Sequence, residues 1–105
     1  MARIRVEPAG IEFEAEPNET VMEAAFARGV FWPHGCEGLG QCTNCALEIV
    51  SGLGRVSPLT RTERYNLLRQ RGPRAVENPR LRLACQLYAL GDIVVRKLGV
   101  RPDTI

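Results

Sequence analysis

The chain has 105 residues, of which 45% are hydrophobic and 25% are charged, and this balance predicts one compact domain over residues 1–105. No apolar run approaches the roughly 18 residues that cross a bilayer, and the start lacks the form of a secretory signal. We therefore expect a protein without a membrane span that is cytoplasmic or has been matured after import. Residues 1–50 carry three Arg and eight Glu, a net charge of −5, whereas residues 51–105 carry eleven basic and four acidic residues, a net charge of +7. The basic half contains no recognised nucleic-acid motif, so we expect no nucleic-acid partner.

The chain begins with two segments in which polar and apolar residues alternate. Ile4 and Val6 share one face of residues 3–7, and residues 11–15 alternate in the same way. The Pro-Ala-Gly sequence between them is typical of a turn. The two segments therefore predict a β-hairpin.

A helix is predicted next, over residues 20–28. Thr20 and Glu23 have the spacing of a capping box, in which each side chain satisfies a backbone N–H of the other residue. Apolar residues recur behind them with helical spacing, and Gly29 is a suitable stop.

A loop follows at about residues 33–45, because its glycines and proline argue against regular structure. Residues 46–50 then have the composition of a strand. A second capping box, Thr60 with Glu63, predicts a helix over residues 61–71 that ends at the following Gly-Pro.

Two further strands are predicted, at residues 81–87 and 92–98. The complete order is then strand, strand, helix, strand, helix, strand, strand. Strands that occur in pairs around helices indicate an α+β fold with a mixed sheet.

The four cysteines carry the strongest functional signal. Their spacing is Cys36-x5-Cys42-x2-Cys45, and Cys85 follows after 39 further residues. Four thiolates from one loop and one distant strand can converge on a compact site. In a chain without a secretory signal, such cysteines indicate metal binding or redox chemistry more than structural disulfides.

Three kinds of site compete for these thiols. Structural zinc accepts four thiolates, but its ligands usually come as two short Cys pairs, and this chain has one. Thiol exchange or a disulfide suits a Cys-x2-Cys at the start of a helix, whereas here the pair precedes a predicted strand. A 2Fe–2S cluster requires four Cys ligands, and three clustered cysteines with one remote are typical of it.

The sequences CEGLGQCTNC and RLACQ resemble those of 2Fe–2S ferredoxins with a five-residue first gap. These are the adrenodoxin-like proteins, related bacterial ferredoxins and the N-terminal ferredoxin modules of corrinoid-activating reductases. The resemblance runs from Ile4 to about Val95. It implies the β-grasp fold, in which a mixed sheet cradles the main helix and a second helix follows the cluster loop.

The resemblance also implies which residues bind a 2Fe–2S cluster. In the family, the first two cysteines bind one iron and the last two bind the other. That pattern puts Cys36 and Cys42 on the iron nearer the surface, and Cys45 and Cys85 on the inner iron. The chain departs from the family at Thr43, where many members have Gly, and this departure leaves the reduction potential open.

Other residues near the cysteines have simpler interpretations. A Rieske centre needs two histidines on one iron, and His34 is the single histidine of the chain, so that variant is excluded. We interpret His34 as an exposed loop residue in preference to a modulator of the cluster. Core packing is the preferred interpretation of Trp32, ahead of shielding the cluster. Three glycines in the loop allow the backbone to wrap closely and to point N–H groups at sulfur.

The function predicted from this resemblance is one-electron transfer, not enzymatic catalysis. We expect a monomer that makes transient contacts with a reductase and an electron-acceptor protein. Two alternatives stay open, which are a redox-sensing or interaction module with the same cluster and a zinc-stabilised binding domain.

Charge distinguishes this chain from the adrenodoxin-like proteins, which dock through an acidic helix after the third cysteine. The matching segment here carries four arginines against Glu63, a net charge of +3; the arginines are Arg61, Arg64, Arg69 and Arg71. The acidic docking surface therefore does not carry over, and we expect partners with an acidic face.

Overall fold

A computed structural model describes residues 2–33 and 44–102, and its first two strands form the predicted hairpin. These strands are β1 (Ala2–Glu7) and β2 (Ile11–Ala15), which pair antiparallel with Ile4 opposite Phe13. Their alternating residues divide as predicted, because Ile4, Val6 and Phe13 are buried while the residues between them are mostly exposed.

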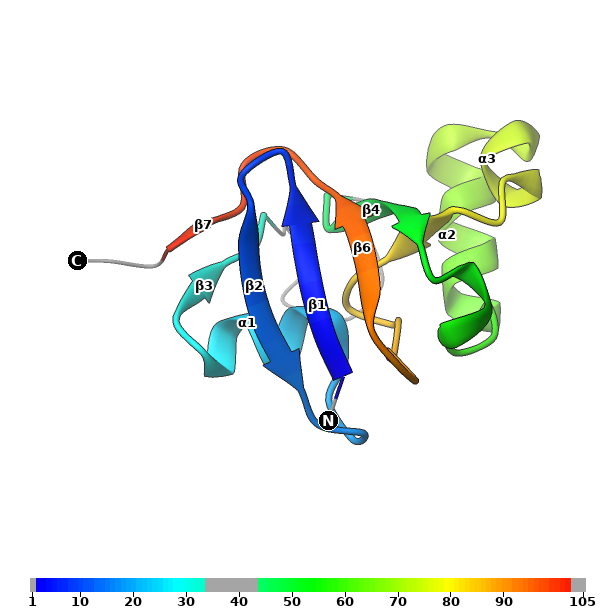
Figure 1. The fold of residues 1–105 in the computed structure, drawn as a ribbon. Helices are drawn as coiled ribbons and strands as arrows, with labels where there is room; N and C mark the ends of the chain where they lie inside the picture. The colour runs from blue at the N-terminus through cyan, green and yellow to red at the C-terminus, as the bar shows by residue number, and fades with distance from the viewer. Residues whose placement is uncertain (1, 34–43, 103–105) are drawn as a thin grey trace.

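The hairpin lies at one edge of a five-stranded mixed sheet with the order β2-β1-β6-β4-β5 (Figure 1). The other three strands are β4 (Ala46–Ser51), β5 (Leu81–Leu83) and β6 (Ile93–Arg96). β6 runs parallel to β1, whereas β4 is antiparallel to both β6 and β5. The predicted α+β class and β-grasp fold are confirmed.

Helix α1 (Val21–Ala27) packs across one face of the sheet (Figure 1). Its N-terminus has the complete capping box that Thr20 and Glu23 predicted. Four of its residues, Val21, Met22, Ala24 and Ala25, are buried in the core with the inward side chains of β1 and β2.

Helix α2 (Arg61–Arg71) also starts at its predicted capping box and ends at Gly72. The following Gly-Pro ends one helix but begins another, the unpredicted α3 (Pro73–Glu77). Pro73 is tolerated at the first helical position, because its missing N–H would have had no partner there. The part of the chain that the structure describes contains no helix long and apolar enough to span a membrane.

The predicted strands at residues 81–87 and 92–98 are both too long. β5 ends at Leu83, since residues 84–86 form a turn in which the N–H of Gln86 donates to the carbonyl of Leu83 at 3.0 Å. β6 ends at Arg96.

Besides α3, three shorter elements were not predicted. They are the 3-10 helix η1 (Leu53–Arg55) and the strands β3 (Val30–Phe31) and β7 (Arg101–Pro102), which pair antiparallel as a separate small sheet (Figure 1). Elements of two or three residues are too short to show a hydrophobic period.

Candidate metal centre

The structure brings two of the four candidate cysteines together. Cys45 directly precedes β4, and Cys85 lies in the turn after β5, the strand that pairs with β4. Their exposed fractions are 1% and 6%, and the two thiol groups are within hydrogen-bonding distance. The other two candidates, Cys36 and Cys42, lie outside the described residues, as do His34 and Thr43.

The start of helix α1 holds the turn that carries Cys85. The N–H of Val21 donates to the carbonyl of Leu87 at 2.8 Å, and that of Met22 donates to the carbonyl of Ala84 at 3.1 Å. Such first-turn N–H groups have no partner within their own helix, so they are available for this contact. The two bonds fix the backbone on both sides of the cysteine.

The segment that carries Cys45 is fixed by two side chains from distant parts of the chain. Trp32 is fully buried, as predicted, and its indole N–H donates to the carbonyl of Cys45 at 3.0 Å. The Nζ of Lys97 donates to the carbonyl of Asn44 at 2.7 Å. Sequence analysis identified Trp32 as a core residue but predicted neither hydrogen bond.

The surroundings of Cys45 favour its thiolate. The pKa of Cys45 is lowered to about 6, chiefly by a hydrogen bond with the Cys85 thiol, although burial opposes the shift. Backbone N–H groups of Cys85 and Ala84 and the charge of Lys97 add to the lowering. The thiolate is the form of cysteine that binds metal. A pair of buried, soft sulfur donors therefore fits an iron–sulfur cluster, and it also fits zinc.

A buried ion pair connects helix α2 to the strand that leads to Cys85. Arg82 donates through Nε and Nη2 to the two carboxylate oxygens of Glu63, both at 2.8 Å, and the exposed fractions of the two side chains are 5% and 0%. Glu63 Oε2 also accepts the N–H of Leu83 at 3.0 Å. Sequence analysis treated Glu63 as a capping residue and a surface charge. The clue that it missed was Arg82, a charged residue within an otherwise apolar strand.

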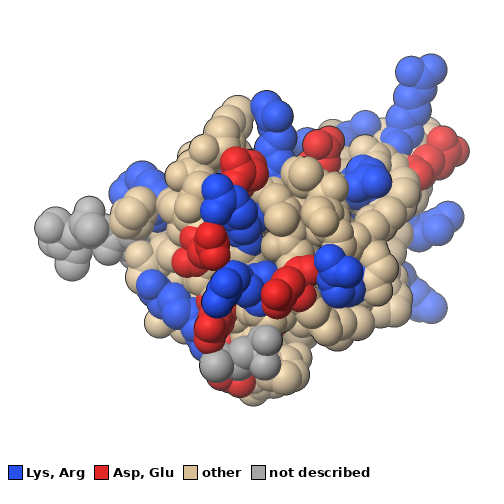
Figure 2. Space-filling model, viewed as in Figure 1, with Lys and Arg blue, Asp and Glu red and all other residues tan. Residues whose placement is uncertain are grey.

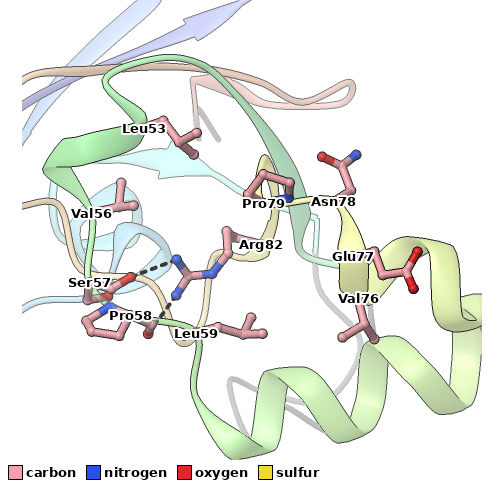
Figure 3. A pocket seen from close by; sticks show the side chains of 10 residues that line it. All are labelled: Leu53, Val56, Ser57, Pro58, Leu59, Val76, Glu77, Asn78, Pro79 and Arg82. Carbon is pink, nitrogen blue, oxygen red and sulfur yellow. Dashed lines mark hydrogen bonds between the residues drawn. The ribbon is translucent and has the colours of Figure 1, made fainter.

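The guanidinium of Arg82 also lines a mostly apolar hollow of about 370 Å³ between η1 and α3 (Figure 3). It donates there to the carbonyls of Ser57 at 2.7 Å and Pro58 at 3.0 Å, shown as dashed lines. These bonds and those to Glu63 engage the guanidinium on all sides. We therefore interpret Arg82 as a structural residue that joins three segments of the chain.

Comparison with known proteins identifies the kind of cofactor. The family of 2Fe-2S iron-sulfur cluster binding domains matches residues 4–90. The 2Fe-2S ferredoxin-5 of Aquifex aeolicus is 33% identical over 95 residues, which cover 90% of this chain and 97% of that protein. The 2Fe-2S ferredoxin of Pseudomonas aeruginosa is 36% identical over 89 residues, which cover 84% of this chain and 76% of that protein.

A solved structure places the same fold within a larger protein. The Amycolatopsis cytochrome P450 reductase GcoB superposes with a TM-score of 0.70 and 27% sequence identity. The match covers 97% of this chain but 28% of the reductase. The chain thus spans nearly the whole length of the Aquifex ferredoxin and about a quarter of the length of the reductase.

Proposed function

The chain belongs to the 2Fe–2S ferredoxin family, and we propose that Cys36, Cys42, Cys45 and Cys85 are the four ligands of its cluster. The observation that carries this proposal is the buried contact between Cys45 and Cys85, which come from positions 40 apart in the sequence. When bound, the cluster supplies one-electron redox chemistry. The residues described above exclude water from the two thiols and hold their backbone in place.

The proposed role is to carry single electrons from a reductase to an acceptor enzyme such as an oxygenase. This role is supported by the family membership and by the likeness to part of a cytochrome P450 reductase. Within residues 2–33 and 44–102, no group of three or more His, Cys, Asp or Glu side chains gathers into a metal site separate from the cysteines. We propose a carrier without a substrate reaction of its own, because the relatives that the chain matches over most of its length are ferredoxins.

We further propose that the carrier is a cytoplasmic monomer and that its contacts with partners are transient. Analytical ultracentrifugation of the purified protein tests the monomer, and cell fractionation tests the compartment.

The positive charge on the outer face of α2 favours a redox partner with an acidic surface. Because Glu63 points inward to Arg82, it does not offset the four exposed arginines of that helix. Charge complementarity of this kind speeds association most at low salt. The rate of electron transfer from the reductase should therefore fall as ionic strength rises, and a rate that does not change would remove this part of the proposal.

Anaerobic redox titration followed by EPR tests the cluster directly. The purified protein should be red-brown, contain two iron and two sulfide per chain, and give the EPR signal of a reduced 2Fe–2S centre. Zinc in place of iron would refute the proposed cofactor. Turnover by a reductase at catalytic rates distinguishes a carrier from a redox sensor, since a sensor need not be reduced and reoxidised rapidly.

The ligand assignment is tested by Cys85→Ala beside a matched control at the next residue. Cys85→Ala should abolish the cluster, measured as iron and sulfide content. Gln86→Ala should keep it, because Gln86 only donates a long hydrogen bond of 3.8 Å to the Cys85 sulfur. A Cys85→Ala protein with full iron and sulfide would show that another residue is the fourth ligand.

A further inference from the structure

A groove of about 430 Å³ opens beside Cys45, between the end of α2 and the neighbouring ends of β4, β5 and β6. Its lining carries three cationic side chains, those of Arg71, Arg96 and Lys97, and one carboxylate, that of Glu48. The lining therefore has a net charge of +2. Glu48 lies opposite Arg96 in the β4–β6 pairing and offsets one of the three cations.

The distribution of charge differs between the open face of the sheet and the side formed by α2 and α3. Basic and acidic side chains alternate over β2, β1 and β6, whereas basic side chains predominate at the right of the molecule, over α2 and α3 (Figure 2). On the sheet face, Arg5 pairs with Glu7 and Glu12. An approaching acidic surface would therefore meet paired charges on the sheet and an excess of positive charge along the α2 side.

The groove also has an apolar part. Leu98 is 69% exposed, and Leu81 is half-buried in the lining. Protein interfaces commonly combine such an apolar centre with a charged rim, in which the charges select the partner and the apolar contact holds it.

The groove is next to the expected cluster, which links it to electron transfer. Ala46, the neighbour of Cys45, belongs to the lining, and Lys97 is bonded to the carbonyl of Asn44. Burial lowers the pKa of Lys97, the charge of Cys45 opposes that shift, and the charge of Arg71 adds to it. The hydrogen bond to Asn44 places the ammonium group of Lys97 on the segment that carries Cys45.

We propose that this basic groove is the docking site for a carboxylate-rich segment of a redox partner, with Leu98 contacting an apolar side chain of that segment. The proposal rests on the electron-carrier function proposed above. It adds the location of docking, which is the groove formed by Arg71, Arg96, Lys97 and Leu98. A partner seated there would lie against the residues that adjoin Cys45.

Binding is tested with fluorescently labelled hexaglutamate as a probe of acidic protein surfaces. Its affinity for the oxidised holoprotein is followed by fluorescence anisotropy at low salt. The affinity should fall about three-fold in Arg96→Gln and about three-fold in Lys97→Gln, each compared with wild type. Lys97→Arg should keep the wild-type affinity. Arg3→Gln, which removes the same charge from β1, should also keep it.

A basic groove could also bind nucleic acid. A labelled thymidine hexanucleotide distinguishes a nucleic-acid partner from an acidic protein partner. If the oligonucleotide binds as tightly as hexaglutamate and responds equally to the groove variants, a protein partner is not favoured and the proposal is overturned. Hexaglutamate binding that Arg3→Gln weakens as much as Arg96→Gln would also overturn it, since the groove would then have no special role.

Electron transfer is tested with two inorganic oxidants of equal and opposite charge. The reduced protein gives one electron to trisoxalatocobaltate(III), a trianion, or to hexaamminecobalt(III), a trication, and each Co(III) becomes Co(II). In stopped-flow measurements, Arg96→Gln should slow the trianion about three-fold and should not slow the trication, and Lys97→Gln should slow the trianion more than the trication. Equal rates for wild type and both variants with the trianion would refute electron transfer through the groove.

Iron and sulfide content and the visible spectrum are measured on every variant before these tests. A wild-type protein without a reversibly reducible cluster would refute the proposed function itself. A normal cluster combined with unchanged binding and rates in the groove variants would refute the docking site alone.

Discussion

The α2–β5 region and the β1–β2 hairpin both contain Arg–carboxylate pairs with short contacts, but the pairs differ in their access to water. In the hairpin, the side chains of Arg5 and Glu12 are 45% and 43% exposed and meet at 2.8 Å. Between α2 and β5, Arg82 and Glu63 meet at the same distance with 5% and 0% exposed. Water competes for the first pair and salt screens it, whereas the second pair is protected from both.

The difference shows that two ion pairs with equal contact distances need not contribute equally to stability. The charged side chains of the hairpin can lose a partner and be hydrated instead. The buried pair cannot, since each of its members also satisfies backbone groups, namely the N–H of Leu83 and the carbonyls of Ser57 and Pro58. Because β5 leads directly to Cys85, the region next to the proposed cluster should tolerate substitution less well than the hairpin.

Arg82→Met should give the largest effect. It leaves the Glu63 carboxylate buried without its partner, and such losses destabilise proteins by about 3–5 kcal/mol. The matched variant Arg5→Gln in the hairpin should cost about 1 kcal/mol or less. Urea unfolding of both holoproteins measures the difference. Equal losses in the two variants would contradict the comparison between the regions.

A double-mutant cycle sharpens the result for the buried pair. Glu63→Leu combined with Arg82→Met removes both charges, so it should be less destabilised than the sum of the two single variants by about 1–3 kcal/mol. The same cycle on Arg5 and Glu12 should give about 0.2–1 kcal/mol. Additive losses at Glu63 and Arg82 would mean that each side chain acts through its backbone contacts and not through the pair.

The sequence predicts what depends on local spacing and misses what depends on tertiary contacts. Both capping boxes follow from residues three positions apart, so the starts of α1 and α2 were predicted correctly. The second oxygen of Glu63 pairs with a residue 19 positions away, and no local pattern marks that contact. The spacing of the cysteines likewise singled out Cys45 and Cys85, and the structure places their thiols within hydrogen-bonding distance of each other.

The extent of the strand near Cys85 shows the same limit. The residues after Leu83 continue an apolar pattern, which is why the prediction extended the strand to residue 87. Their conformation is set instead by the first N–H groups of α1, which donate to the carbonyls of Ala84 and Leu87 on either side of Cys85. Periodicity reports burial, and both a turn and a strand can be buried.

Trp32→Phe should give an intermediate effect in the cysteine region. It keeps an aromatic ring in the core but removes the donor to the carbonyl of Cys45, and a lost hydrogen bond of this kind typically costs about 1–3 kcal/mol when its partner stays buried. Urea unfolding measures the loss, and the EPR spectrum of the reduced protein reports whether the Cys45 side of the centre has shifted. Phe13→Leu in the hairpin, also a change within the core, should leave the EPR spectrum unaltered. An EPR change in Phe13→Leu but not in Trp32→Phe would contradict the role assigned to the indole N–H.

The smallest effect is expected at Glu19 and Arg28, which flank α1 and pair near the surface at 2.7 and 2.8 Å. The Arg28 guanidinium, with help from the N–H of Glu16, holds the pKa of Glu19 below its ordinary value of 4.5. A lowered pKa means that the pair stabilises the fold above about pH 4.5 and that this contribution is lost as pH falls through the folded-state pKa.

In Arg28→Gln, NMR titration of the Glu19 carboxyl should therefore show its pKa returning upward. The stability difference from wild type should be small at pH 7 and should shrink further on acidification, because protonation of Glu19 removes the same attraction that the substitution removes. A stability difference that grew at low pH would show that Arg28 stabilises the protein through a contact other than its pair with Glu19. This ion pair would then no longer illustrate how water weakens an exposed pair.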